Sequence, residues 1–195
     1  MTNDELREVL RRDVVAAAPA LLGSILVRGS MRARIVEVEA YRSDDPASHA
    51  FRGRTPRNGV MYGPPGLAYV YFNYGVHWML NIVCHEPEDP AAVLIRAAVP
   101  LEGLDQMLVN RGVSRDKDLL SGPGKLAKAF GITGADTGID LLGGNADLQL
   151  LAPEAVVTNV LTGPRIGIAV GKWHDVPWRF VDGDAVGWAS KPRKM

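Results

Sequence analysis

The sequence predicts one domain of the α+β class, in which short helices surround strands joined by many turns. Its 195 residues fit a single domain covering 1–195, and 47% apolar residues are enough to form a sizeable core. The 21 glycines and 13 prolines exceed the average share and favour a turn-rich mixed fold over a helical bundle. Strand-like runs in the first half of the chain support the mixed class.

The N-terminal segment is expected to form two short helices, over residues 3–12 and 14–22. Asn3 and Asp13 are candidate N-caps because their side chains can accept hydrogen bonds from the first backbone amides of a helix. Pro19 predicts that the second helix is irregular or begins late, since proline lacks the backbone donor that a helix interior needs.

The middle of the chain is expected to form strands separated by turns and by one long loop. Runs of alternating apolar residues predict strands over 24–28, 31–41, 67–73, 77–85 and 91–99. Gly29-Ser30 and Tyr74-Gly75 mark the tight turns of two hairpins. The loop over 42–66 is rich in proline, glycine and arginine, and a loop of this length in a compact domain is usually functional or disordered. Helices are expected over 101–111 and 124–130, and short strands and turns from residue 147 onward.

The composition excludes several classes of protein. The single cysteine, Cys84, allows neither an internal disulfide nor a cysteine-based zinc site, and we expect it to be a small buried residue in a strand. The four histidines lack metal-ligand spacing, so neither a metal nor a cofactor is expected. The chain shows no leader segment and no apolar run long enough to cross a bilayer, so we expect no membrane partner and a cytoplasmic, nucleoid-associated location.

The charge is neutral in total but unevenly distributed. Nucleic-acid-binding domains are often basic, whereas this chain has a formal net charge of zero. However, no aspartate or glutamate lies between Pro46 and His85, and this stretch carries Arg52, Arg54 and Arg57. Such local positive charge can steer a polyanion and bind its phosphates. The alternative is an ordinary solvated loop.

Two carboxylates lie on one predicted strand. Side chains alternate across a strand, so Glu37, Glu39 and Tyr41 share one face. Val36, Val38 and Ala40 share the opposite face, which is expected to pack on the core. One interpretation is that both glutamates are solvated and pair with Arg34 or Arg96. The other is that a carboxylate beside an aromatic ring and an arginine loop serves as a base in catalysis.

The second hairpin carries a set of tyrosines. Tyr69, Tyr71 and Asn73 share one face, and Tyr74 lies at the turn beside Gly75, which permits the bend. For Tyr69, packing in the core is the favoured interpretation. An aromatic ring at a hairpin tip either plugs into another part of the protein or inserts between base steps of a duplex. Rings that stack on bases can offset the cost of extruding one base.

Two further segments offer cations beside turns. Ser121-Gly-Pro-Gly-Lys125 is expected to cap a helix, and Lys125 could hold a phosphate at the helix start. Arg165, in Thr162-Gly-Pro-Arg-Ile, is a candidate for the same role. The spacing does not match the phosphate-binding P-loop.

Together these residues suggest an enzyme that draws one base out of duplex DNA and removes it. Two alternatives remain open on the residues alone. A non-catalytic nucleic-acid-binding module would use the same tyrosines and arginines, with Glu39 an incidental acid. A structural or scaffolding protein would dock its tyrosine hairpin on a protein partner.

The sequence resembles the alkyladenine (3-methyladenine) DNA glycosylase family. Single blocks of the match are short, but their order and density along nearly the whole chain make it specific. The matching blocks are 34–41, 47–49, 55–58, 69–71, 74–75, Asn81, 93–96, 100–103, 121–126, 163–167 and 177–180.

The resemblance implies a compact bacterial member with one mixed domain around a curved antiparallel sheet and a protruding β-hairpin. It implies a monomeric enzyme without metal that acts on double-stranded DNA and excises alkylated or deaminated purines. The expected product is an intact strand with an abasic site, because no lysine lies near Glu39 in sequence to form a Schiff base. The loop between Tyr41 and His49 is one residue shorter than in mammalian members and contains Asp44-Asp45-Pro46.

The resemblance also implies roles for individual residues. Glu39 would be the general base that activates water, and Arg96 would help orient that water and a phosphate. Tyr74 would fill the gap left in the duplex, and Asn81 would reject purines with an exocyclic 2-amino group. The residues that would line the pocket and sandwich the flipped base are Tyr41, His49 and Tyr71.

Overall fold

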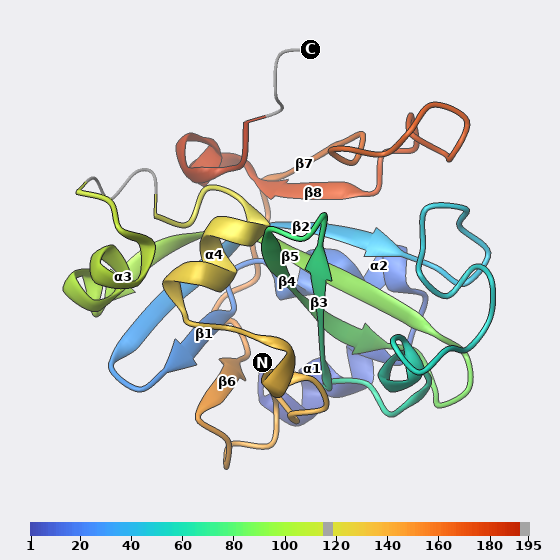
Figure 1. The fold of residues 1–195 in the computed structure, drawn as a ribbon, viewed down its shortest axis with the longest axis horizontal. Helices are drawn as coiled ribbons and strands as arrows, with labels where there is room; N and C mark the ends of the chain where they lie inside the picture. Colours follow the sequence, from blue (N-terminus) through green and yellow to red (C-terminus); the bar gives the residue numbers. More distant parts are fainter. Residues whose placement is uncertain (115–118, 192–195) are drawn as a thin grey trace.

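One curled antiparallel sheet organises the molecule (Figure 1). The computed structural model describes residues 1–114 and 119–191. Within these residues the strands of the sheet are β1 Ile25–Arg28, β2 Met31–Tyr41, β3 Ala68–Asn73, β4 His77–Cys84, β5 Ala91–Glu102, β6 Leu148–Leu151, β7 Val160–Gly163 and β8 Arg179–Asp182. The order of the main path is β3-β4-β5-β2-β1-β6, and β7 and β8 join it through β2. The predicted strands and the short C-terminal strands are therefore confirmed.

Strand β2 is the centre of the sheet. It pairs with β5 along most of its length, and on its other edge it pairs first with β1 and then with β8. Pairs with β8 involve Glu37, Val38 and Glu39. The carboxylate-bearing half of β2 therefore has strands on both sides, so it lies inside the sheet and not at an edge.

A distortion between β2 and β5 changes which side chains face the core. Ile35 pairs with Ala98 and Glu37 with Ala97, so Val36 is an extra residue on β2, and Arg96 is likewise extra on β5. Such bulges redirect side chains. Ile35 packs in the main core, whereas Val36 packs with Ala97 and Ala185 in a separate cluster. The prediction that Val36 shares a core face with Val38 and Ala40 is therefore wrong, because strict alternation does not continue through a bulge.

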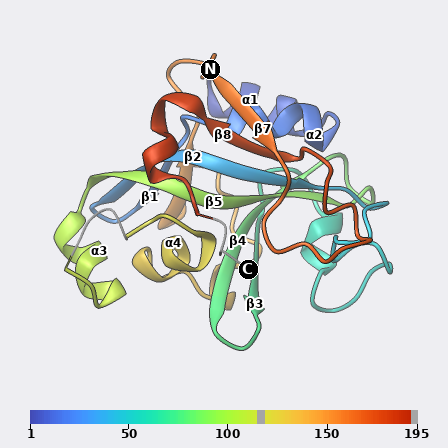
Figure 2. The ribbon, with the colours of Figure 1, turned by 90° about the horizontal axis from the view of Figure 1, so that it is seen from above.

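The helices are short and cap the sheet. In the described residues they are α1 Asn3–Leu10, α2 Val14–Ala17, α3 Leu104–Arg111 and α4 Pro123–Ala129, with 3₁₀ helices η1 Ala18–Leu21, η2 Gly59–Tyr62, η4 Gly134–Asp136 and η5 Gly183–Trp188. Viewed from above, α1 and α2 lie on one side of the sheet and α3 and α4 on the other (Figure 2). Apolar side chains from α1, α2 and α4 join those of the strands in one buried cluster. The predicted α+β fold around a curved antiparallel sheet is confirmed.

The helix starts agree only in part with the predicted caps. Asp13 caps α2 as expected, and the helix tightens to the 3₁₀ helix η1 where Pro19 lies. The cap of α1 is Thr2 and not Asn3, because Thr2 and Glu5 form a reciprocal capping box. The segment from Ser121 to Lys125 caps α4 as expected, with Gly122 in the N-cap position.

The β3–β4 hairpin projects from the sheet (Figure 2). Tyr74 and Gly75 form its tip with φ angles of 50° and 67°. Helix α4 supports the hairpin at close range, because a Cβ atom on Gly124 would lie 2.7 Å from Cγ of His77. A residue larger than glycine would have to push that ring aside. No helix among the described residues is both long and apolar enough to cross a membrane.

Candidate active site

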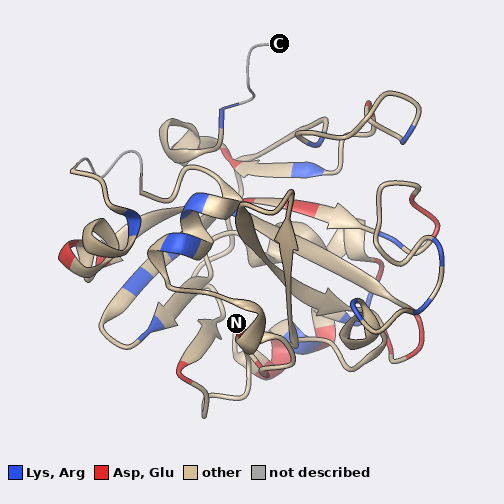
Figure 3. Ribbon diagram, viewed as in Figure 1, with Lys and Arg blue, Asp and Glu red and all other residues tan. Residues whose placement is uncertain are grey.

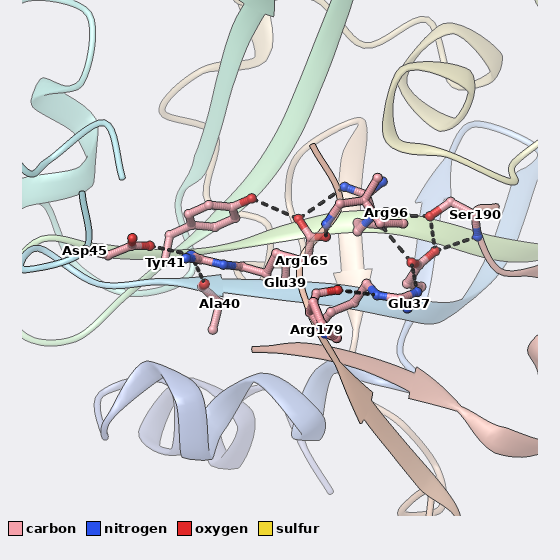
Figure 4. A network of polar contacts seen from close by, with 11 residues as sticks. Glu37, Glu39, Ala40, Tyr41, Asp45, Arg96, Arg165, Arg179 and Ser190 are labelled. Atoms are coloured by element: carbon pink, nitrogen blue, oxygen red, sulfur yellow. Dashed lines mark hydrogen bonds and ion pairs between the residues drawn. The ribbon is translucent and has the colours of Figure 1, made fainter. Parts of the chain in front are cut away.

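Glu39 is fully buried and accepts hydrogen bonds from three directions (Figure 4). Its Oε2 accepts from the hydroxyl of Tyr41 at 2.8 Å and from Nη1 of Arg96 at 3.1 Å. Its Oε1 accepts from the backbone amide of Ile166 at 2.7 Å. Glu37 is equally buried. The interpretation of both acids as solvated surface glutamates is therefore wrong, although the pairing of Glu39 with Arg96 that it included is present.

Tyr41 is held at both its hydroxyl and its ring. Burial and the negative charge of Glu39 raise the pKa of Tyr41 well above its usual value, so the hydroxyl keeps its proton and donates a hydrogen bond to the carboxylate. The guanidinium of Arg165 lies over the ring, 4.6 Å from its centre, and 5.2 Å from the ring of Trp178. One face of Tyr41 is thus covered by a cation.

Arg165, a predicted phosphate ligand, lies in a buried ion pair. Its side chain is fully buried, forms an ion pair with Asp45 and donates to the carbonyl of Ala40 at 3.0 Å. The contact of Arg165 with a phosphate stays a prediction. The same ion pair explains Asp45, an acid in the loop that departs from the mammalian pattern. Sequence spacing offers no signal for this pair, since its members lie 120 positions apart.

A second group of rings comes from the hairpin and the long loop. Tyr69 is buried, as its core interpretation predicts, and its hydroxyl lies 2.7 Å from Nδ1 of His49. The ring centres of His49 and Tyr71 are 4.4 Å apart in an edge arrangement. Burial raises the pKa of both tyrosines to about 12. Glu39 contributes to the rise for Tyr71, which places that ring within electrostatic range of the carboxylate.

His49 is neutral at physiological pH. Burial and the positive charge of Arg57 lower the pKa of its ring. Because Tyr69 keeps its proton, its hydroxyl can donate to Nδ1 of His49 in the tautomer that carries its hydrogen on Nε2. The loop that carries His49 is fixed by Asn58, whose Nδ2 donates to the carbonyl of His49 at 2.8 Å. Asn58 lies in the matching block 55–58, but its spacing from His49 gives no signal of this contact.

Asn81 and Tyr74 occupy opposite ends of the hairpin. Asn81 is buried on β4, pairs across the hairpin with Tyr69 and donates to the carbonyl of Tyr69 at 3.0 Å. Tyr74 is 90% exposed at the tip. The alternative that Tyr74 plugs into another part of the chain is therefore wrong.

The predicted phosphate ligands differ in their surroundings. Figure 3 shows basic bands on α4 and on the long loop, on either side of a hairpin without acidic residues. Arg52 is exposed, and Arg54 pairs with Glu88 over the ring of Tyr62. Arg57 donates to the carbonyl of Phe72 at 3.1 Å and lies over the ring of Tyr71.

Lys125 and Arg96 complete the set of predicted cations. Lys125 donates to Oγ of Ser121 at 3.0 Å at the start of α4. Arg96 is 6% exposed and lies between the two buried glutamates, so its contact with a phosphate stays a prediction. No group of three or more histidine, cysteine or acidic side chains among the described residues could hold a metal ion.

Comparison with known proteins relates this site to a family. A model described as methylpurine-DNA glycosylase (MPG) matches residues 8–185. Three relatives carry the name "Putative 3-methyladenine DNA glycosylase". That of Rhodopseudomonas palustris (strain BisB18) is 49% identical over 176 residues, which cover 89% of this chain and 84% of the relative. That of Nitrosospira multiformis is 50% identical over 166 residues, which cover 85% of this chain and 83% of the relative. That of Burkholderia cenocepacia is 48% identical over 181 residues, which cover 89% of this chain and 85% of the relative.

The chain belongs to the methylpurine-DNA glycosylase family. The resemblance predicted from the sequence blocks is thus confirmed. The protein is a DNA glycosylase, a hydrolase of N-glycosyl bonds that acts in base excision repair. Family membership decides against the two alternatives of a non-catalytic binding module and a scaffolding protein.

Proposed function

We propose that this glycosylase flips a damaged purine out of double-stranded DNA and hydrolyses its N-glycosidic bond with Glu39 as the base. The proposed substrates are alkylated or deaminated purines of the 3-methyladenine, hypoxanthine and ethenoadenine class, and the product is an abasic site in an intact strand. The observation that supports this most directly is the buried carboxylate of Glu39, whose polar contacts within the described residues are all with hydrogen-bond donors.

The distribution of donors suggests where the attacking water binds. Each carboxylate oxygen offers two lone pairs. Oε2 of Glu39 already accepts from Tyr41 and Arg96, whereas Oε1 accepts only from the Ile166 amide among the contacts in the described residues. We therefore assign the water to Oε1. A positioned base of this kind contributes roughly 10²–10⁴-fold to a rate.

The proposed chemical step is the displacement of the purine from C1′ by water. The water oxygen forms a bond to the sugar carbon C1′ and gives one proton to Glu39, while the bond from C1′ to the purine nitrogen breaks and its electron pair leaves with the base. A cationic alkylated purine leaves as a neutral molecule. A neutral lesion gains one proton as it leaves, which solvent water supplies, so the net reaction adds one water across the bond. Positive charge that develops on the sugar is stabilised by the nearby carboxylate.

Arg96 places a positive charge beside Glu39. Although burial opposes the charge of Arg96, Glu39 and Glu37 outweigh it and raise the pKa of the guanidinium. Arg96 is thus a permanent cation beside the base. In this role it fixes the orientation of the carboxylate and acts as a counter-charge within the protein.

The aromatic rings suggest how the flipped base is held. Because Arg165 covers one face of Tyr41, a base can stack only on the opposite face. Tyr71 and His49 would supply the second wall of the pocket. A cationic purine between such rings gains up to about 2 kcal/mol once it is desolvated. Asn81 would exclude purines with an exocyclic 2-amino group.

The exposed tip of the hairpin suggests how the duplex is opened. Tyr74 would occupy the space that the extruded nucleotide leaves, as inserted side chains do in other bent duplexes. The exposed arginines Arg52, Arg54 and Arg57, together with Lys125, would contact phosphates on either side. The protein is proposed to act as a monomer.

A panel of duplexes with one defined lesion tests the proposal. Wild-type protein should convert hypoxanthine, ethenoadenine and 3-methyladenine sites to alkali-labile sites, and it should not nick the strand before alkali is added. Glu39→Gln should abolish base release yet bind the lesion duplex as tightly as wild type. Excision at the normal rate by Glu39→Gln would falsify this mechanism.

A further inference from the structure

A second buried carboxylate lies beside the proposed base but takes no direct part in the chemical step above. Glu37 is fully buried and accepts from Nη1 of Arg179 at 3.0 Å and from the backbone amide of Ser190 at 2.6 Å. It also accepts from the hydroxyl of Ser190 and forms an ion pair with Nε of Arg96 at 3.4 Å. Burying a carboxylate is costly unless such partners surround it. A charge at this position therefore needs a structural or functional reason.

The contacts of Arg96 indicate that reason. Its Nε side faces Glu37 and donates to Oγ of Ser190 at 3.2 Å, and its Nη1 donates to Glu39 at 3.1 Å (Figure 4). A planar guanidinium contacted at both ends has a fixed orientation. The bulges in β2 and β5 bring these groups together, because Arg96 is itself the extra residue on β5.

Ser190 comes from the other end of the chain. It follows η5, lies 153 positions after Glu37, and is buried. Its hydroxyl links Glu37 to Arg96, and its backbone amide is tied to the same carboxylate. The C-terminal segment thus reaches the group that orients the proposed base.

We propose that Glu37 and Ser190 are positioning residues that hold the guanidinium of Arg96 against Glu39. The C-terminal segment at Ser190 then completes the catalytic centre as well as covering the sheet. This inference rests on the proposed function of Glu39. It predicts that substitution of Glu37 or Ser190 slows the chemical step and leaves DNA binding nearly unchanged, because neither residue is proposed to touch DNA.

Single-turnover excision on a hypoxanthine duplex tests this proposal. We expect Glu37→Gln to slow excision by about 10- to 100-fold, the range that small misplacements of catalytic groups produce. Lesion binding should stay within about twofold of wild type, because the rings and surface cations are untouched. Asp136→Asn is the matched control, since Asp136 is also buried and paired with an arginine, Arg28, outside this network. That control should excise at the wild-type rate.

Ser190 provides a test that does not depend on the folding of Glu37→Gln. Ser190→Ala removes the hydroxyl that joins Glu37 to Arg96 and should slow excision several-fold, whereas Ser190→Thr keeps a hydroxyl and should recover most of the rate. A purely structural role predicts that both Ser190 variants excise at the same rate. Less than a twofold difference between them would overturn the proposal.

A double-mutant cycle separates positioning from general destabilisation. If Glu37 acts through Arg96, Glu37→Gln should slow excision no further in an Arg96→Gln background. Additive losses would contradict the proposal. Failure of the mechanism proposed for Glu39 gives a different result. In that case the wild-type protein does not excise the base, or the Glu39→Gln variant does. If Glu39→Gln is inactive while Glu37→Gln and Ser190→Ala behave like Asp136→Asn, only the positioning roles are wrong.

Discussion

Tyr41 donates its hydroxyl hydrogen to Oε2 of Glu39 across 2.8 Å, from two positions further along the same strand. The contact is possible because alternate side chains of β2 point to one face beyond the bulge. It joins the proposed base to the ring proposed to stack on the purine. A base and a stacking surface linked in this way keep a fixed relative orientation.

Removal of this hydroxyl should affect chemistry more than binding. Tyr41→Phe retains the ring over Arg165 but takes one donor from Glu39, which lets the carboxylate rotate. A hydrogen bond to a charged group contributes about 1.5–3 kcal/mol, so we expect single-turnover excision to slow by roughly tenfold or more. Affinity for a lesion duplex should change by less than about twofold. An unchanged excision rate would show that the hydroxyl does not orient the base.

Removing one partner of the buried ion pair between Arg165 and Asp45 should strongly destabilise the fold. Both side chains are fully buried, so Arg165→Met leaves an uncompensated carboxylate and should lower the free energy of unfolding by about 3–5 kcal/mol. Adding Asp45→Asn should restore part of the loss. The exposed pair of Arg54 and Glu88 is the control, and Arg54→Met should change stability by at most about 1 kcal/mol. Chemical denaturation measures all three, and equal effects in both pairs would contradict this assignment.

The ring of His49 predicts a pH dependence of stability. Burial and Arg57 lower its folded-state pKa, so the unfolded chain binds a proton at this ring more readily than the folded protein. The neutral ring contributes its full stabilisation above the unfolded-state histidine pKa of about 6.5. This stabilisation is lost as the pH falls from that value through the lower pKa of the folded state. The stability difference between wild type and His49→Gln should therefore shrink between pH 7.5 and pH 5.5 in calorimetry. A difference that stays constant across this range would argue against a neutral buried ring.

Tyr74 should matter for DNA and not for folding. It is 90% exposed, so Tyr74→Ala should change the free energy of unfolding by no more than about 0.5 kcal/mol. Loss of a stacking ring costs about 1–3 kcal/mol, which weakens lesion binding roughly 5- to 150-fold. Binding is best measured in the Glu39→Gln background, where no base is released. Tyr74→Phe keeps the ring and should bind almost as tightly as wild type. If Tyr74→Ala binds with wild-type affinity, Tyr74 does not insert into the duplex.

Local pattern was sufficient for much of the fold. Period-two alternation and turn residues located the hairpin that ends in Tyr74-Gly75 and the strand that carries Glu37, Glu39 and Tyr41. Both features depend on neighbours within a few positions, which a sequence displays directly. The helix starts were less certain, because Thr2 and Asn3 are both good caps and only their hydrogen bonds distinguish them.

By itself, the amino-acid sequence determined the fold class, the family and the face of β2 on which the acids lie. Tertiary structure alone decided that both glutamates are buried, that Val36 leaves the main core, and that Arg165 pairs with Asp45. The physical reason is the separation along the sequence of the groups that interact. Burial and ion pairing are set by groups that lie more than a hundred positions away, such as Ser190 for Glu37, and by bulges that shift the alternation of a strand.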